Sequence, residues 1–125
     1  MLYKSAEDFY NKVATIKRLS REEEKELALK MVNEGDENAQ KALVIGYLPV
    51  LAAYLKRYTC TPSLDMIYEG VEILETSIAT FDFLYDSPSP NVTFVHFLSD
   101  KVRRMMTRYI ADKASFGRAR NNNKA

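Results

Sequence analysis

The chain has 125 residues, of which 46% are hydrophobic and 28% charged, and its net charge of +1 fits one ordinary globular domain. A single cysteine, Cys60, excludes an internal disulfide, and with one histidine, His96, a His/Cys metal cluster cannot be assembled. The sequence has no apolar run of about 18 residues and no apolar signal-peptide core, so we expect a cytoplasmic protein that does not enter the membrane.

The first half of the sequence predicts three helices. A short helix opens after Ser5, and a capping box at residues 20–23 begins a second helix, which ends at Gly35. Asp36 caps a third helix that runs to about Tyr58. This third helix is apolar almost all round, which is typical of the buried centre of a bundle.

The second half predicts two further helices. The fourth runs from about Ser63 to Thr80, and its apolar residues recur at 3,4,3,4 spacing, which makes one inward stripe. A loop containing two prolines follows over residues 81–91. The last helix starts near Thr93 and ends before Gly117. Its expected inward residues are Phe94, Leu98, Val102, Met105 and Tyr109.

These elements predict an all-α fold. Only four glycines and four prolines interrupt the chain, and no alternation of β type is sustained. We expect residues 1–117 to form one compact bundle of about five helices. Residues 118–125 are polar and basic, and we expect them to be a disordered tail.

Charge is distributed unevenly along the second half. Between Arg57 and Lys101 there are seven acidic residues and no Lys or Arg, whereas from Lys101 onward eight basic residues face Asp112 alone. A chain with an acidic middle and a basic end is able to bind two different partners. The alternative is that both segments are ordinary solvated helix faces.

Signatures of catalysis are missing. The sequence has no glycine-rich phosphate loop, no G-x-S-x-G and no H-E-x-x-H. Its carboxylates fall at exposed helical positions, and Cys60 with His96 is the only Cys–His pair available. We therefore expect no enzyme, no catalytic residue, no cofactor and no metal site.

Several short segments occur in a recognisable order. They are RLSREEEKELA at 18–28, GDENA at 35–39, KRY at 56–58, LDMIYEG at 64–70, ATFD at 79–82 and VRRMMTRYIAD at 102–112. In order and spacing they resemble the end of the first and the whole of the second conserved region of bacterial RNA polymerase sigma factors. The third and fourth regions have no counterpart in the chain. We therefore expect a fragment, one half of a split factor in which a separate chain supplies the fourth region, or a protein that does not direct initiation alone.

The resemblance implies a polymerase-docking helix. In the family, the helix that matches LDMIYEG docks on a coiled coil of the largest polymerase subunit. A row of carboxylates that no nearby basic residue neutralises also suits a basic partner helix on charge alone. The alternative is a solvated acidic face. The positions that the resemblance implies are Asp65, Tyr68, Glu69 and Glu72, with Tyr68 in place of a glutamine.

The resemblance also implies a DNA-contacting helix. In the family, aromatic residues of the last helix stack on bases of the promoter's minus-ten element, and basic residues hold phosphates. The chain departs from the family because Asp100 and Lys101 replace the paired tryptophans and Tyr47 replaces an asparagine. For Phe94 and Phe97 the alternative is the bundle core. The implied DNA-binding residues are Phe94, Phe97, Lys101, Arg103, Arg104, Thr107 and Arg108.

Together these features predict a sigma-factor-like transcription initiation subunit. Its expected partners are core RNA polymerase and promoter DNA. The missing tryptophans and the acidic loop after the fourth helix favour a second hypothesis, a degenerate sigma mimic that binds polymerase as a regulator or decoy and does not melt DNA. A third hypothesis is a helical module with an unrelated partner.

Overall fold

The structure is an all-α bundle, as the sequence predicts. The computed structural model describes residues 3–81, 83 and 94–122, with side chains described up to residue 111. Within that part of the chain there are five helices and no strand. They are α1 (Ala6–Val13), α2 (Arg21–Glu34), α3 (Glu37–Tyr58), α4 (Leu64–Thr80) and α5 (Phe94–Asn122).

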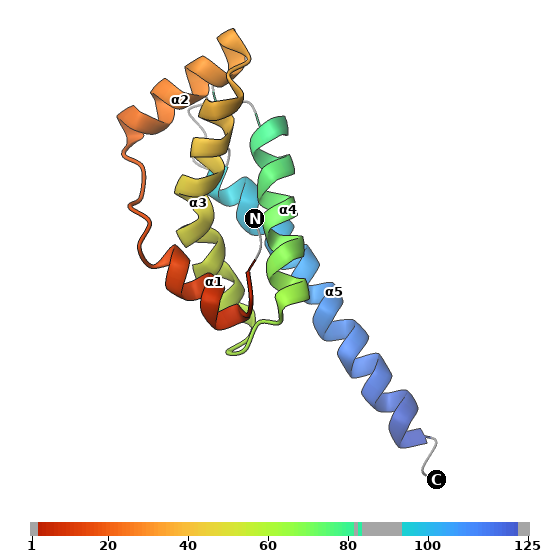
Figure 1. The fold of residues 1–125 in the computed structure, drawn as a ribbon. Helices are drawn as coiled ribbons and strands as arrows, with labels where there is room; N and C mark the ends of the chain where they lie inside the picture. Colours follow the sequence, from red (N-terminus) through yellow and green to blue (C-terminus); the bar gives the residue numbers. More distant parts are fainter. Residues whose placement is uncertain (1–2, 82, 84–93, 123–125) are drawn as a thin grey trace.

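Helix α3 runs through the centre of the bundle. It contacts each of the other four helices, and α4 also packs against α5. Figure 1 shows α1 and α2 on one side of α3, α4 on the other, and α5 crossing behind α4. The central position of α3 explains why its sequence lacks a polar face.

The first four helices begin at polar capping residues, and for the first three these are the residues that the sequence indicates. Ser20 and Glu23 form the reciprocal capping box, with N···O distances of 3.1 and 3.2 Å between each side chain and the other's backbone amide. Ser5, Asp36 and Ser63 each accept a hydrogen bond from a backbone amide in the first turn of the helix that follows. These side chains satisfy amides that have no partner inside the helix, so helix starts can be located from the sequence.

Two glycines serve identifiable structural purposes. Gly35 has φ of 62°, in the left-handed region, and ends α2 as expected. Gly70 lies where α4 meets α3, and a Cβ atom at this position would be 3.2 Å from Cδ1 of Leu51. The absence of a side chain at Gly70 therefore lets the two helices approach closely.

The core is built from the inward stripes of α3, α4 and α5. In α4 the stripe predicted from sequence is confirmed, because Ile67, Leu74 and Ile78 are fully buried. In α5 the predicted inward residues from Phe94 to Met105 are buried and Tyr109 is half-buried. The fully buried side chains of α3 that meet these stripes are Leu43, Leu48, Leu51 and Leu55.

The predicted end of the last helix is wrong. Helix α5 continues past Gly117 to Asn122, so residues 118–122 are helical and not part of a disordered tail. A glycine inside a helix costs only about 1 kcal/mol relative to alanine, which neighbouring helix-forming residues are able to offset. Residues 123–125, and the proline-containing loop apart from positions 81 and 83, lie outside the described residues.

None of the described helices has both the length and the apolar character that crossing a membrane requires.

The buried contact between α3 and α4 provides a test of the core. Replacing Leu51, which is fully buried, with alanine should lower the free energy of unfolding by about 2–5 kcal/mol, because the lost side chain leaves a cavity. Urea unfolding followed by circular dichroism measures this change. The control is Leu29→Ala on α2, where the side chain is 39% exposed and the expected loss is below about 1 kcal/mol. Equal losses in the two variants would contradict the assigned core.

Candidate interfaces on helices α4 and α5

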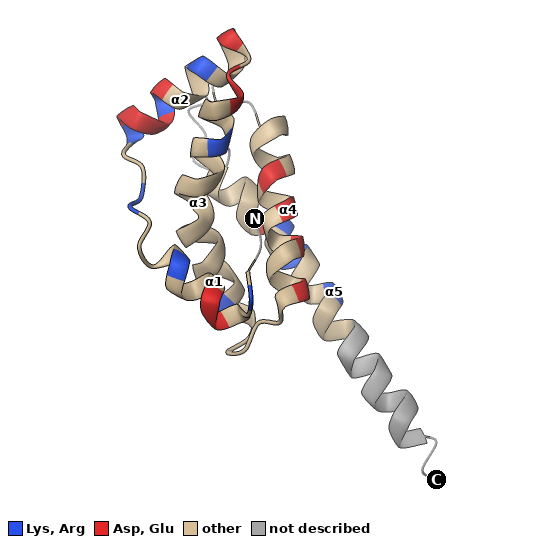
Figure 2. Cartoon of the chain, viewed as in Figure 1, with Lys and Arg blue, Asp and Glu red and all other residues tan. Residues whose placement is uncertain are grey.

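The outward face of α4 is acidic. The helix contains no Lys or Arg, and Figure 2 shows acidic positions recurring along it. Asp65 and Glu72 are exposed, and neither forms an ion pair within the part of the chain whose side chains are described. Two of the predicted polymerase-binding residues are therefore accessible and carry charges that no partner within this part of the chain neutralises.

Glu69 differs from its two neighbours on the acidic face. Its carboxylate accepts hydrogen bonds from the guanidinium of Arg108 and from the hydroxyl of Tyr109, the second with an O···O distance of 2.7 Å. The prediction that no basic residue compensates this stripe is wrong at Glu69. The compensating arginine lies 39 residues away in sequence and reaches Glu69 only because α5 packs against α4.

These bonds alter the acidity of the groups involved. The hydrogen bond from Tyr109, followed by the bond and charge of Arg108, lowers the pKa of Glu69 below its ordinary value of 4.5, although partial burial opposes the shift. The same contact raises the pKa of Tyr109, because the phenolate form would meet the carboxylate. Glu69 is thus held in its ionised form by groups of α5.

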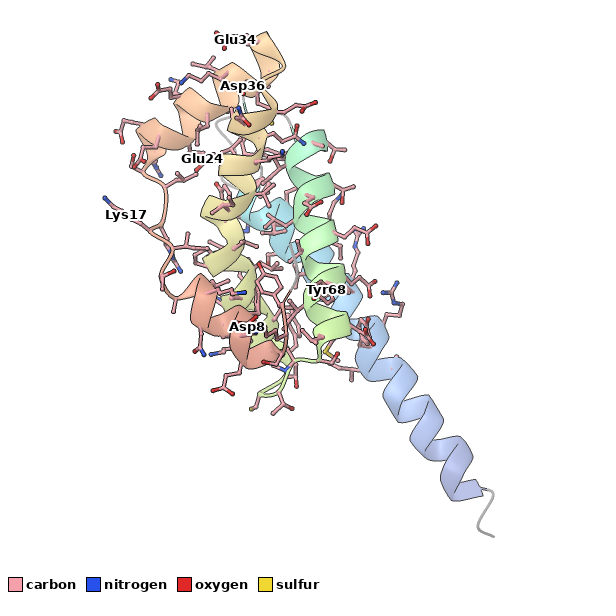
Figure 3. All side chains as sticks on the ribbon, in the orientation of Figure 1. Asp8, Lys17, Glu24, Glu34, Asp36 and Tyr68 are labelled. Atoms are coloured by element: carbon pink, nitrogen blue, oxygen red, sulfur yellow. The ribbon has the colours of Figure 1, made fainter. Side chains whose placement is uncertain are left out.

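Tyr68 has a structural contact within the chain. Its hydroxyl accepts a hydrogen bond from the backbone N–H of Tyr3 and donates one to the Tyr3 carbonyl, both at 2.9 Å. The two rings also lie against each other, with centroids 6.2 Å apart. Tyr68, labelled in Figure 3, therefore fastens the N-terminal segment to α4. Only its half-buried ring is left for the predicted polymerase contact.

The basic residues in the part of α5 whose side chains are described also have partners in the chain. Asp100 accepts from Arg103 at 2.6 Å and pairs with Arg104 at 2.9 Å, and the bond from Arg103 is the main reason that the pKa of Asp100 is lowered. The ammonium of Lys101 lies 4.5 Å from the ring centroid of Phe97. Both arginines remain mostly exposed, so these pairs leave them accessible to an anion.

A shallow depression that is largely open to solvent lies between α4 and α5, and we call it the α4–α5 groove. It has a volume of about 320 Å³. The fold thus brings one predicted polymerase-binding residue, Glu69, together with three predicted DNA-binding residues, which are Lys101, Arg104 and Arg108. Two other predicted DNA-binding residues, Arg103 and Thr107, are exposed but do not line the groove. The lining residues are Glu69, Ile73, Lys101, Arg104, Met105 and Arg108.

Phe94, one of the predicted DNA-binding residues, is buried in the core. Phe94 is only 4% exposed, and its ring packs against Tyr47 and Phe83 with centroid distances of 4.6 and 5.0 Å. The alternative assignment of Phe94 to the core is confirmed. Phe97 is half-buried and packs against Phe81 at 5.2 Å, so part of its surface remains accessible.

The sequence patterns did not predict that the aromatic residues around Phe94 form one cluster. Its members come from α3, from the start of α5 and from the residues just after α4, where Phe81 and Phe83 lie. The only signal in the sequence was the recurrence of phenylalanine at 81, 83, 94 and 97. Burial in this cluster also raises the pKa of Tyr47 well above its usual range.

Comparison with protein-family models gives no match to the chain, and comparison with solved structures gives none either. Functional assignment therefore depends on the ordered motifs and on the geometry of α4 and α5.

The Glu69 contact has a consequence for stability against pH. Because the pKa of Glu69 is lower in the folded chain, its contribution to stability is present above about pH 4.5 and is lost as the pH falls through the folded value. Glu69→Gln lacks this titration. It should lose less stability than the wild type between about pH 5 and pH 3, as measured by urea midpoints. Glu72→Gln should follow the wild type, and parallel curves for all three proteins would contradict the contact.

Proposed function

We propose that this chain is a sigma-factor-like transcription subunit that docks on core RNA polymerase through the outward face of α4. The ordered motifs support the assignment. The observation that carries the docking half is that Asp65 and Glu72 are exposed on one face of α4 without an ion pair among the described side chains. A basic helix, such as one arm of a coiled coil, matches such a face in charge and would be steered to it.

In this proposal the three carboxylates on the outward face of α4 do not all have the same task. Asp65 and Glu72 provide free charge for the partner. Glu69 provides charge at the edge of the face, where it also holds Arg108 and Tyr109 of α5. Gly70 places the whole helix close to α3, so the acidic face is presented on a rigid support.

The DNA-contacting half of the proposal depends on the basic residues of α5. Lys101, Arg104 and Arg108 are gathered in one groove, and a set of cations in a groove is suited to the phosphates of a nucleic-acid strand. Phe97, which is half-buried, provides an aromatic ring with accessible surface beside Lys101. Promoter minus-ten DNA is the ligand that the sigma resemblance implies for this helix, and a separate chain with the fourth sigma region would supply the second promoter contact.

A polymerase-binding mimic that does not melt DNA is the second candidate. It is favoured by the burial of Phe94 and by the absence of tryptophan from the chain. The carboxylates of Asp100 and Glu69 next to Arg104 and Arg108 also weaken the attraction of this helix for phosphate. This candidate retains the docking face of α4 and gives up only the DNA contact.

The docking proposal predicts the effect of charge reversal on α4. Asp65→Lys and Glu72→Lys should each reduce capture of purified core polymerase in a pull-down at least about tenfold, because attraction to a basic partner becomes repulsion. Both side chains are exposed and neither forms an ion pair with another described side chain, so the fold should be kept. The matched control is Glu34→Lys at the exposed end of α2, which makes the same charge change and should leave capture unaltered. Undiminished capture by the α4 variants would remove the docking proposal.

The two candidate functions differ in how the polymerase-bound chain treats DNA. A sigma-like subunit joined to polymerase should bind a single-stranded minus-ten oligonucleotide, with an affinity that falls as salt rises from about 50 to about 200 mM. Fluorescence anisotropy of the labelled oligonucleotide measures this, with core polymerase lacking the chain as the control. Binding no better than that of core polymerase alone would favour the mimic.

A further inference from the structure

We propose that Glu69 is an internal competitor for nucleic-acid phosphate, its carboxylate occupying Arg108 in the α4–α5 groove where a phosphate of a single strand would otherwise bind. The inference depends on the DNA-contacting half of the proposed function and is independent of the docking half. It assigns to Glu69 the control of affinity for DNA, a role distinct from docking.

The basic side chains of the groove form a row along α5. Lys101, Arg104 and Arg108 are spaced i, i+3 and i+7, which places them along one side of α5. Seven residues of helix span about 10 Å, and a nucleic-acid strand carries one phosphate per about 3.4 Å of B-form axis. The row is therefore long enough for more than one backbone phosphate, which favours a strand over a single small anion.

The aromatic neighbour of this row favours a single strand. Phe97 lies at the Lys101 end, with the ammonium over its ring and part of its surface exposed. A basic groove with an aromatic face beside it is the arrangement by which proteins hold single strands, since every base offers a π-face. In the groove lining, Ile73 is half-buried and adds apolar surface on which a sugar or base edge is able to rest, whereas Met105 is buried and adds little.

The groove already holds one oxyanion of its own. The Glu69 carboxylate receives the Arg108 guanidinium and the Tyr109 hydroxyl, which are the donors that a phosphate oxygen would also take. The lining has three cations and this single carboxylate, and Asp100 outside the lining pairs with one of the cations, Arg104. The lining itself therefore has more cations than carboxylates, which favours the binding of a further anion.

A phosphate is able to displace the Glu69 carboxylate from Arg108. The side chains of Glu69 and Arg108 are 31% and 58% exposed, and ion pairs as accessible as this contribute little to stability. A phosphate that displaced the carboxylate would gain a guanidinium contact, while Glu69 would be rehydrated at the groove edge. Removal of the Glu69 charge should therefore raise affinity for a nucleic-acid strand.

The test compares two carboxylates of the same helix. Glu69→Gln and Glu72→Gln remove the same charge, but only Glu69 contacts Arg108. Fluorescence anisotropy with a labelled oligothymidylate of about twelve nucleotides should show Glu69→Gln binding about fivefold more tightly than wild type, and Glu72→Gln changing by less than about twofold. The slope of log affinity against log salt should steepen by about 0.7 for Glu69→Gln alone, which corresponds to one additional phosphate contact.

A second variant separates competition from a general change in charge or fold. Glu69→Gln combined with Arg108→Gln should lose the gain, because the released guanidinium is absent. The inference would be overturned if Glu69→Gln and Glu72→Gln changed the oligonucleotide affinity equally. It would also be overturned if neither the wild type nor Glu69→Gln bound the oligonucleotide. Capture of core polymerase by the wild-type chain reports on the docking proposal alone, because no residue of the α4 face is changed. A gain in DNA affinity for Glu69→Gln without capture by the wild type, or capture without the gain, identifies which proposal has failed.

Discussion

The burial of one stripe of α4 against α3 is the constraint on which the rest of the structure depends. Ile67, Leu74 and Ile78 are fully buried, and Gly70 lets the helix approach Leu51 closely. These contacts fix the rotation of α4 about its axis. Every other position on the helix then has an assigned direction, which leaves Asp65 and Glu72 exposed and directs Glu69 toward α5.

Because of that rotation, the acidic and basic surfaces meet at an ion pair. Glu69 belongs to the acidic face by its place on α4, and Arg108 belongs to the basic groove by its place on α5. A ligand that engages either residue must act on the bond between them. Under the proposed function, the acidic face and the α4–α5 groove therefore meet at the Glu69–Arg108 pair.

The aromatic residues are divided between packing and exposure in a way that shapes any nucleic-acid contact. Phe94 is enclosed by Tyr47, Phe81 and Phe83, so its ring stabilises the junction of α3 and α5 and has little exposed surface. Phe97 retains accessible surface beside Lys101. Affinity for a strand would consequently come more from the basic groove than from stacking, and would depend strongly on salt.

The sequence by itself determined the all-α class, the helix starts at Ser5, Ser20, Asp36 and Ser63, and the inward stripes, because caps and helical periodicity involve residues at most a few positions apart. Only the tertiary structure decided that Arg108 reaches Glu69 across 39 residues and that Tyr68 bonds Tyr3 across 65. It also decided that Phe94 is enclosed and that α5 continues past Gly117. The pairings depend on how whole helices rotate and pack against one another, and no local pattern of residues encodes which side chains then meet.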